Sequence, residues 1–187
     1  YLVLGSLVTR VGLREKQERG LAEARGGRRG PENVWGSAST GACLSLLIGA
    51  GVEPRSLLLV GFSASFAAKL ADTFGSEIGK RWGRRPVLIT TLRSVPPGTE
   101  GAISLAGTLA SAAGSVLMTL VMWQLQLLPS ISVSLVVMLI GLLATLAESL
   151  LGALAQERFR WLSNELVNAL QTLLDAVMAR LWLGGRI

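Results

Sequence analysis

The sequence predicts an all-α, polytopic integral membrane bundle with about six spans. Half of the 187 residues are hydrophobic and only 16% are charged, whereas a soluble domain usually carries about 25% charged residues. Several apolar segments reach the roughly 20 residues that a helix needs to cross a bilayer. A membrane β-barrel would show short segments of alternating hydrophobicity instead. We therefore expect residues 1–187 to form a single helical membrane domain.

The spans follow one another as apolar segments separated by polar ones. Residues 1–11 are about half a span long and lack the basic start of a signal peptide, so we expect a truncated N-terminal span that begins before this chain. The next two spans are expected at 35–50 and 57–74, where small residues would let neighbouring helices pack closely. The last three are expected at 101–128, 131–155 and 164–183.

Basic residues are concentrated in alternate loops. The loops at about 12–33, 75–100 and 156–163 carry most of the Lys and Arg residues, and the loops between them carry few. Because cytoplasmic loops of membrane proteins are enriched in Lys and Arg, these three loops are predicted to be cytoplasmic. We expect a protein of the cell inner membrane or a thylakoid membrane, with its active face toward the cytoplasm.

The sequence contains no histidine and a single cysteine, Cys43. Catalysis by a serine–histidine–aspartate triad, a histidine general base, a cysteine-cluster zinc site and an internal disulfide are thereby excluded. Cys43 lies among small residues, and we expect it to pack without reacting. The net charge of +6 is explained by the placement of loop charges in a membrane protein, so no nucleic-acid partner is expected.

Polar residues recur at helical spacing near the cytoplasmic ends of three spans. One face of the third span carries Lys69, Asp72, Ser76 and Lys80. The fifth span carries Gly141, Thr145, Glu148, Gly152 and Gln156, and the sixth carries Asn164, Asn168, Gln171 and Asp175, with Glu165 beside them. For Asn and Thr, bonding between helices explains the pattern as well as a site does. Ionisable Asp72 and Glu148 favour a site, because such groups are costly at depth without a partner.

Acids and bases on one side of the membrane are typical of a site for phosphate and a metal. Carboxylates suit Mg²⁺ (or Mn²⁺) held together with substrate phosphates, and arginine binds phosphate in a bidentate manner. The glycine-rich segments 26–30 and 96–101 each precede an expected helix, whose first N–H groups can bind phosphate. The segment Gly75–Arg81 has neither the spacing nor the final Ser/Thr of a P-loop.

These motifs resemble the phytyl-phosphate kinase family, which includes plant enzymes of tocopherol synthesis and uncharacterised transmembrane proteins. The resemblance rests on segments 71–79, 86–91 and 95–101, the last followed by Gly107, Ala110 and Ser111. Arg29, Asn33 and Val34 upstream and segments 148–156 and 164–168 downstream fit the same pattern. It covers about residues 20–170. Two local features depart from the family: Glu148 stands where many relatives have Asp, and the loop at 157–163 is short.

The resemblance implies transfer of the γ-phosphate of a nucleoside triphosphate, with CTP favoured, to phytyl or another prenyl monophosphate. The candidate catalytic residues are Lys69, Asp72, Glu77 and Glu148. The candidate nucleotide- and phosphate-binding residues are Arg29, Asn33, Lys80, Arg84, Arg85, Arg93, Thr99, Gly101, Asn164 and Asn168. The candidate metal ligands are Asp72, Glu77, Glu148 and Glu165.

Other functions stay open on the sequence alone. A lipid cytidylyltransferase or a prenol kinase would need the same polar residues with a different acceptor. A non-catalytic transporter or scaffold that binds a phospholipid is the candidate from another class, although the repeats or broken helices of many transporters are not evident. The expected partners are a prenyl monophosphate, a nucleotide and the membrane, and an oligomer is compatible with the sequence.

Overall fold

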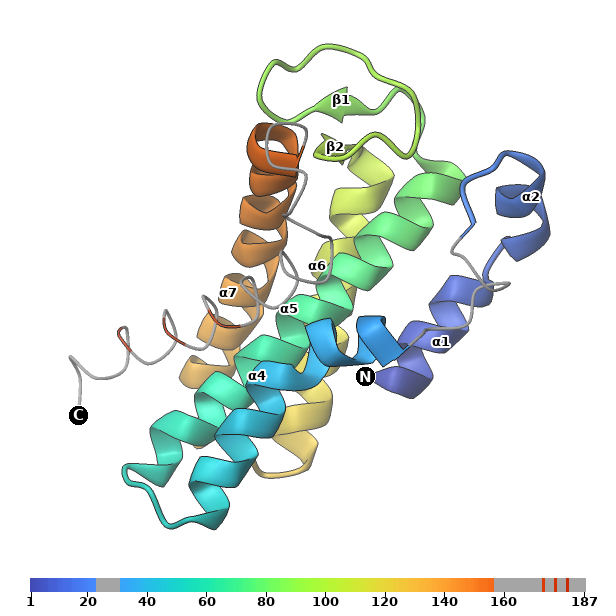
Figure 1. Cartoon of the computed structure of the whole chain (residues 1–187). Coiled ribbons are helices and arrows are strands. Elements are labelled where there is room, and N and C mark those ends of the chain that lie inside the picture. The colour runs from blue at the N-terminus through green and yellow to red at the C-terminus, as the bar shows by residue number, and fades with distance from the viewer. Residues whose placement is uncertain (23–30, 157–172, 174–176, 178–180, 182–187) are drawn as a thin grey trace.

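The computed structural model describes residues 1–22, 31–156, 173, 177 and 181 of the chain. In these residues the α-helices are α1 (Leu2–Arg10), α2 (Leu13–Glu18), α4 (Pro31–Gly49), α5 (Arg55–Trp82), α6 (Leu105–Gln124) and α7 (Ile131–Leu151). A π-helical turn, η1 (Gly152–Gln156), continues α7, and the strands β1 (Val87–Leu88) and β2 (Ala102–Ile103) pair between α5 and α6. Figure 1 shows this order along the chain.

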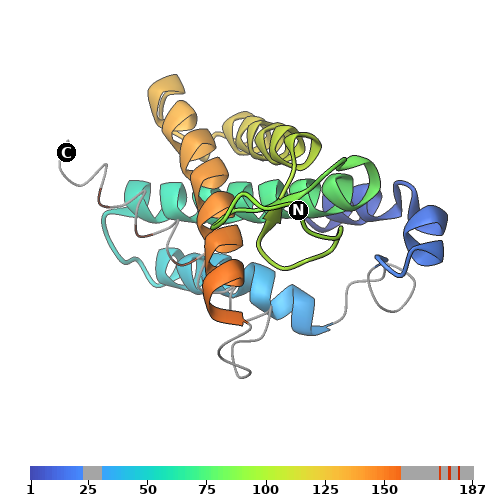
Figure 2. The ribbon, with the colours of Figure 1, turned by 90° about the horizontal axis from the view of Figure 1, so that it is seen from above.

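Helix α5 lies at the centre of the bundle and contacts α1, α4, α6 and α7. Its alanines at positions 64, 67, 68 and 71 are fully buried, because small side chains allow helix backbones to approach closely. The partner helices supply glycines at the same contacts: Gly114 of α6 lies against Leu70 and Ala71, and Gly141 of α7 lies against Ala67. Seen from above, α7 crosses α5 at an angle (Figure 2).

Three helices of the described residues are long and apolar enough to cross a membrane: Arg55–Trp82, Leu105–Gln124 and Ile131–Leu154. The predicted all-α membrane fold is confirmed. Of the six or so predicted spans, these three are supported by the structure. Helix α4, although 19 residues long, is not among them, and the expected span at 164–183 lies outside the described residues except for Leu173, Val177 and Leu181.

The outer faces of α6 and α7 are apolar. On α6 the exposed side chains include Leu105, Leu109 and Leu120, and on α7 they include Leu135, Leu139 and Leu143. Spacings of four and eleven residues on α6 and of four residues on α7 place each set on one side of its helix. In water such a surface would be an interaction patch. In a membrane span it is the surface expected against lipid.

The predicted loop at 75–100 is wrong at its start, because α5 continues as a helix to Trp82. A helix of 28 residues is about 42 Å long, whereas the hydrocarbon core of a bilayer is about 30 Å thick. Of the charged residues that suggested a loop, Glu77, Lys80 and Arg81 therefore belong to helical turns that extend beyond the apolar layer. Lys80 and Arg81 lie in the last turn, where cations interact favourably with the helix dipole.

A short hairpin covers this end of the bundle (Figure 1). Strands β1 and β2 are antiparallel, and Val87 pairs with Ile103. Helix α6 then begins at Leu105, later than the predicted 101, because Ser104 caps it by accepting a hydrogen bond from Gly107 N–H at 3.1 Å. The sequence did not predict the hairpin. Its two strands are the only non-helical elements among the described residues.

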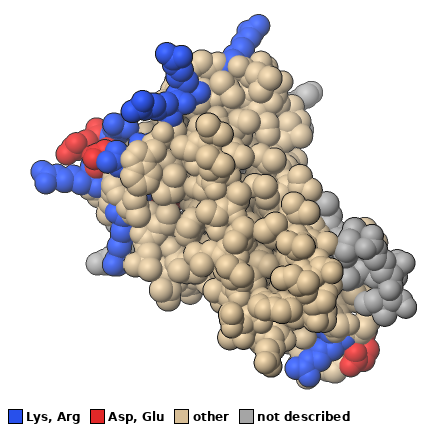
Figure 3. Space-filling model, turned by 180° about the vertical axis from the view of Figure 1, so that it is seen from behind, with Lys and Arg blue, Asp and Glu red and all other residues tan. Residues whose placement is uncertain are grey.

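Charge is distributed unequally between the two ends of the bundle. Seen from behind, Lys and Arg gather at the end that carries α2 and the hairpin, and a broad uncharged band separates them from a small charged group at the other end (Figure 3). The exposed cations of the first end include Arg14, Arg19, Arg84, Arg85 and Arg93. The cytoplasmic orientation of the hairpin end stays a prediction, which rests on the same Lys and Arg residues.

Candidate active site

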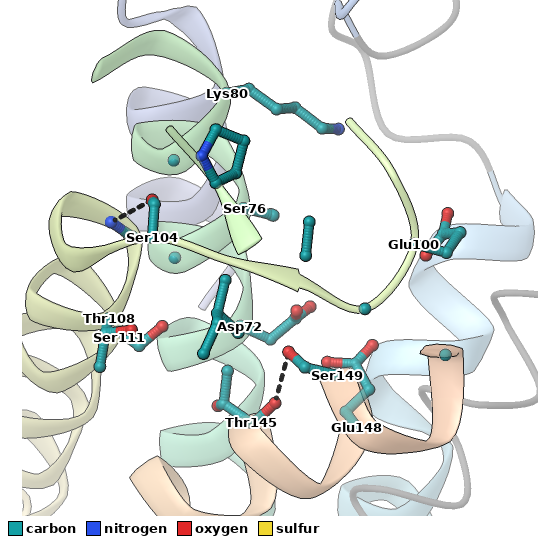
Figure 4. Close-up of a pocket in the computed structure, with 18 of the residues that line it drawn as sticks. Asp72, Ser76, Lys80, Glu100, Ser104, Thr108, Ser111, Thr145, Glu148 and Ser149 are labelled. Atoms are coloured by element: carbon teal, nitrogen blue, oxygen red, sulfur yellow. Dashed lines mark hydrogen bonds between the residues drawn. The ribbon is translucent and has the colours of Figure 1, made fainter. Parts of the chain in front are cut away.

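A polar cavity of about 210 Å³ opens at the hairpin end of the bundle. Its walls come from α5, α6 and α7, and the segment 97–103 forms its roof (Figure 4). The polar side chains that line it are Lys69, Asp72, Thr73, Ser76, Glu77, Lys80, Thr99, Glu100, Ser104, Thr108, Ser111, Thr145, Glu148 and Ser149. We refer to this cavity as the polar pocket.

The polar pocket brings together two of the three predicted polar faces. All four residues of the α5 face line it, from Lys69 to Lys80, and so do Thr145, Glu148 and Gly152 of the α7 face. The two helices meet below the pocket at Gly141, where a Cβ would lie 3.1 Å from the α5 backbone at Ala67 and 2.6 Å from Ser115 Oγ of α6. The third predicted face, on residues 164–175, lies outside the described residues apart from Leu173.

Lys69, Asp72 and Glu148 form the charged centre of the polar pocket. The Lys69 ammonium donates to Asp72 Oδ2 at 2.6 Å, and Lys69 also interacts electrostatically with Glu148. Asp72 and Glu148 face one another from α5 and α7 (Figure 4). Because Lys69 is almost fully buried, its charge is stable there only beside these acids.

Helix α2 is attached to α5 by two ion pairs. Glu77 binds Lys16, and both side chains are almost fully buried, 2% and 1% exposed. Lys16 also donates to the Thr9 carbonyl oxygen at 2.8 Å. Arg81 pairs with Glu15 at the surface. In the structure the Glu77 carboxylate is thus held by Lys16, which competes with the catalytic and metal-binding roles that the sequence suggested for it.

The predicted phosphate-binding cations are separated by the fold. Lys80 lines the polar pocket, whereas Arg84, Arg85 and Arg93 are exposed on the hairpin segment and do not line it. Thr99 and Gly101 are in the roof. Helix α4 includes Asn33, but its side chain is not described, and Arg29, Asn164, Glu165 and Asn168 lie outside the described residues.

Gly101 is placed in the roof by backbone geometry. Its φ of +73° is in the left-handed region that favours glycine. A Cβ at this position would lie 2.4 Å from Cβ of Ala153 and 2.7 Å from the Ser149 carbonyl oxygen. The hairpin can therefore rest on the end of α7 only because residue 101 has no side chain.

Several polar residues of the polar pocket were absent from the predicted site. Glu100 enters from the roof and interacts electrostatically with Glu148. Ser104, Thr108 and Ser111 come from α6, and Ser149 comes from α7, where it donates to the Thr145 carbonyl oxygen at 3.1 Å. The signal for the α6 residues was their helical spacing along one face, which is equally typical of close helix packing.

The acids of the polar pocket do not form a complete metal cage. Within the described ranges, no three His, Cys, Asp or Glu residues lie close enough together to hold a metal ion. Asp72 and Glu148 are two hard oxygen ligands on facing helices. Mg²⁺ is commonly bound by one or two carboxylates together with substrate phosphates and water, and this pair fits that mode of binding.

Comparison with known proteins gives the family. A family model described as "Integral membrane protein DUF92" matches residues 1–176. An uncharacterized membrane protein of Synechocystis sp. is 47% identical over 96% of this chain and 69% of its own length. "Protein VTE6, chloroplastic" of Arabidopsis thaliana is 41% identical over 96% of this chain and 55% of its own length. An uncharacterized membrane protein of Methanocaldococcus jannaschii is 35% identical over 95% of this chain and 71% of its own length.

No solved structure matches the chain. The match of the family model over almost the whole chain, with relatives in a plant chloroplast, a cyanobacterium and an archaeon, confirms the family resemblance that the motifs indicated. The chain belongs to the DUF92 family of integral membrane proteins.

Proposed function

We propose that this protein is a membrane-embedded kinase that transfers the γ-phosphate of a nucleoside triphosphate to phytyl or another prenyl monophosphate. The observation that carries the proposal is the meeting of Lys69, Asp72 and Glu148 in one polar pocket at the end of three membrane-length helices. The resemblance of the motifs to phytyl-phosphate kinases, together with 41% identity to the chloroplast protein VTE6, supports the same activity.

The proposed reaction forms one phosphorus–oxygen bond and breaks another. A phosphate oxygen of the prenyl monophosphate attacks the γ-phosphorus, and the bond from that phosphorus to the β,γ-bridging oxygen breaks. The products are a prenyl diphosphate and a nucleoside diphosphate. A monophosphate with a second pKa near 6 is largely ionised at pH 7, so the attack needs no strong base. A sequence without histidine is compatible with this chemistry.

Positioning and electrostatics would supply the catalysis, as in other phosphoryl transfers. Asp72 and Glu148 would hold Mg²⁺ or Mn²⁺ together with the donor phosphates. The metal would neutralise charge on the transferred group. Lys80, which lines the polar pocket, would bind a phosphate oxygen. The preference for CTP rests on the family resemblance, and no residue of the polar pocket is assigned to the base.

The depth of the polar pocket suits an acceptor that is a lipid. Ser111 of the pocket lies six residues beyond Leu105, the first residue of α6, which corresponds to about 9 Å along the helix axis. The pocket therefore extends from the charged end of the bundle to the edge of the apolar span. The phosphate group of a prenyl phosphate can therefore enter the polar pocket while its hydrocarbon chain stays in the bilayer.

The acceptor and the reaction can be tested together. The full-length protein, purified and placed in lipid nanodiscs, is supplied with γ-labelled CTP or ATP and with either phytol or phytyl monophosphate. We expect label to appear in a prenyl diphosphate made from the monophosphate. Efficient labelling of phytol, with no labelling of the monophosphate, would make the protein a prenol kinase.

Two further outcomes would assign the protein to a different functional class. Release of pyrophosphate from CTP with transfer of the cytidylyl group would indicate a cytidylyltransferase. Tight binding of phytyl monophosphate without any transfer would indicate a transporter or a scaffold. Either outcome would overturn the proposed kinase activity.

A further inference from the structure

The two sides of the polar pocket differ in chemistry. Glu148 comes from α7 and Glu100 from the roof, so this side is acidic. The α6 side carries only neutral polar groups, the hydroxyls of Ser104, Thr108 and Ser111. In Figure 4 these hydroxyl residues lie opposite the two glutamates, with Asp72 between them. A metal with its nucleotide is attracted to the acidic side, which leaves the α6 side for a different group.

Two α6 hydroxyls are available to a ligand. Among the described residues, neither Thr108 Oγ1 nor Ser111 Oγ has a hydrogen-bond partner. Ser111 is only 4% exposed, so bulk water contributes little to its hydrogen bonding. Its Oγ occupies the space beside Gly75, where a Cβ would lie 2.1 Å away. A buried hydroxyl that lines a cavity without a partner is suited to a polar ligand, because an unmade hydrogen bond is costly.

The start of α6 adds to this arrangement. The N-cap Ser104 satisfies only the Gly107 N–H of the first turn, and a helix start has further N–H groups without an intrahelical acceptor. The helix dipole at this end favours an anion. Thr108 and Ser111 follow within the next two turns, on the same wall of the polar pocket. The dipole at the start of α6 therefore adds to the attraction of an anion toward these hydroxyls.

We infer that the α6 wall is the subsite for the phosphate of the lipid acceptor, held by the hydroxyls of Thr108 and Ser111 near the start of α6. The inference rests on the proposed kinase function, since it divides that site between acceptor and donor. The placement next to lipid favours the acceptor over the nucleotide. Leu105 and Leu109, which adjoin these donors on α6, are 77% and 62% exposed on the apolar surface.

The path of the hydrocarbon chain follows from the same wall. Leu146 of α7 is the one apolar side chain that the membrane-length helices contribute to the lining of the pocket within the described residues. Below it, α6 and α7 are joined where Ser115 donates to the Met138 carbonyl oxygen at 2.7 Å. The hydrocarbon chain would therefore leave the polar pocket past Leu146, above this contact.

Binding measurements without turnover test the subsite. The full-length protein in nanodiscs is titrated with phytyl monophosphate, with CTP and Mg²⁺, and with inorganic phosphate. Thr108→Val and Ser111→Ala remove one hydroxyl each with little change of shape. Each variant is expected to weaken binding of phytyl monophosphate about tenfold, which corresponds to one hydrogen bond to a charged group. Binding of CTP is expected to stay within about twofold of wild type, because the nucleotide lies on the acidic side.

A matched control comes from the same helix. Thr119 is buried and has no hydrogen-bond partner among the residues that the structure describes. Because it does not line the polar pocket, Thr119→Val is expected to leave both affinities unchanged. Inorganic phosphate is expected to bind wild type far more weakly than the lipid, because it lacks the chain that passes Leu146. Equal affinity for the two would refute the lipid assignment.

Two other results would overturn the inference. Weakened binding of CTP with unchanged binding of phytyl monophosphate would place the donor on the α6 wall. Unchanged binding of both ligands in both variants would remove the subsite. The proposed kinase function is tested separately by the transfer assay, so a protein that binds the lipid through these hydroxyls but transfers no phosphate would refute the kinase and keep the subsite.

Discussion

At the scale of single residues, the buried pair of Lys16 and Glu77 explains how a short helix is held against the polar pocket. When two opposite charges are buried, the attraction between them roughly offsets the free energy lost when both leave water. Removal of one partner leaves a buried charge without compensation. We therefore expect the pair to fix where α2 lies on α5 and to add little net stability to the fold.

This pair yields a double-mutant prediction. Lys16→Met is expected to lower the free energy of unfolding by about 3–5 kcal/mol, whereas Lys16→Met combined with Glu77→Met should recover most of that loss. Unfolding in mixed detergent measures both. Arg14→Met is the control, since Arg14 is 92% exposed and contributes little.

The same double variant separates a structural role of Glu77 from a catalytic one. If Glu77 serves only to bind Lys16, the stable double variant should keep its phosphotransfer activity. A double variant that is stable but inactive would restore the catalytic or metal-binding role predicted from the sequence. A single variant as stable as Arg14→Met would show that the ion pair has no structural importance.

At the scale of elements, the hairpin and the end of α7 must fit together at Gly101. Gly101→Ala is expected to displace the hairpin, because an alanine with φ near +73° is strained and its Cβ would overlap Ala153. The roof that carries Glu100 would move with it, and phosphotransfer should fall by about tenfold or more, since small misplacements in an active site are costly. Activity assays on purified protein give the result.

Gly49→Ala serves as the control for this prediction, because a Cβ there meets nothing within 4 Å and Ala is favoured in a helix. It should keep full activity. Wild-type activity in Gly101→Ala would show that the roof is not part of the site.

The elements that could be predicted are those governed by apolar length and helical spacing. The spans of α5, α6 and α7 follow from their long apolar segments, and the faces through Asp72 and Glu148 follow from a period of 3.6 residues. The end of α5 could not be placed, because charged residues on a helix that leaves the membrane resemble a charged loop. The hairpin has strands of two residues, which are too short to show an alternating pattern.

Part of the candidate site could not be identified for a chemical reason. Ser and Thr on an apolar helix serve packing and binding alike, so helical spacing alone did not distinguish Thr108 and Ser111 from packing residues. Lys80 and the hairpin arginines have the same charge in the sequence, and only the fold separates Lys80 in the polar pocket from the exposed Arg84, Arg85 and Arg93.

At the scale of the whole molecule, the unequal distribution of charge predicts the orientation in the membrane. In a Cys43→Ser background, a cysteine at Arg93 should be labelled by an impermeant thiol reagent from the cytoplasmic side only. A cysteine at Glu53, in the opposite turn, should be labelled from the other side only. Labelling of both positions from one side would contradict the arrangement of α5 as a membrane span.

If the polar pocket transfers phosphate with the help of Asp72, loss of this one carboxylate must abolish transfer. The most direct test is the Mg²⁺-dependent transfer of γ-label from CTP to phytyl monophosphate, by wild type and by Asp72→Asn in nanodiscs. Glu18→Gln, a matched loss of one surface carboxylate, is the control. We predict transfer by wild type and by Glu18→Gln, and a loss of about a hundredfold or more per folded molecule in Asp72→Asn, in which Glu148 still lies beside Lys69. Near-normal transfer by folded Asp72→Asn would contradict the proposed site.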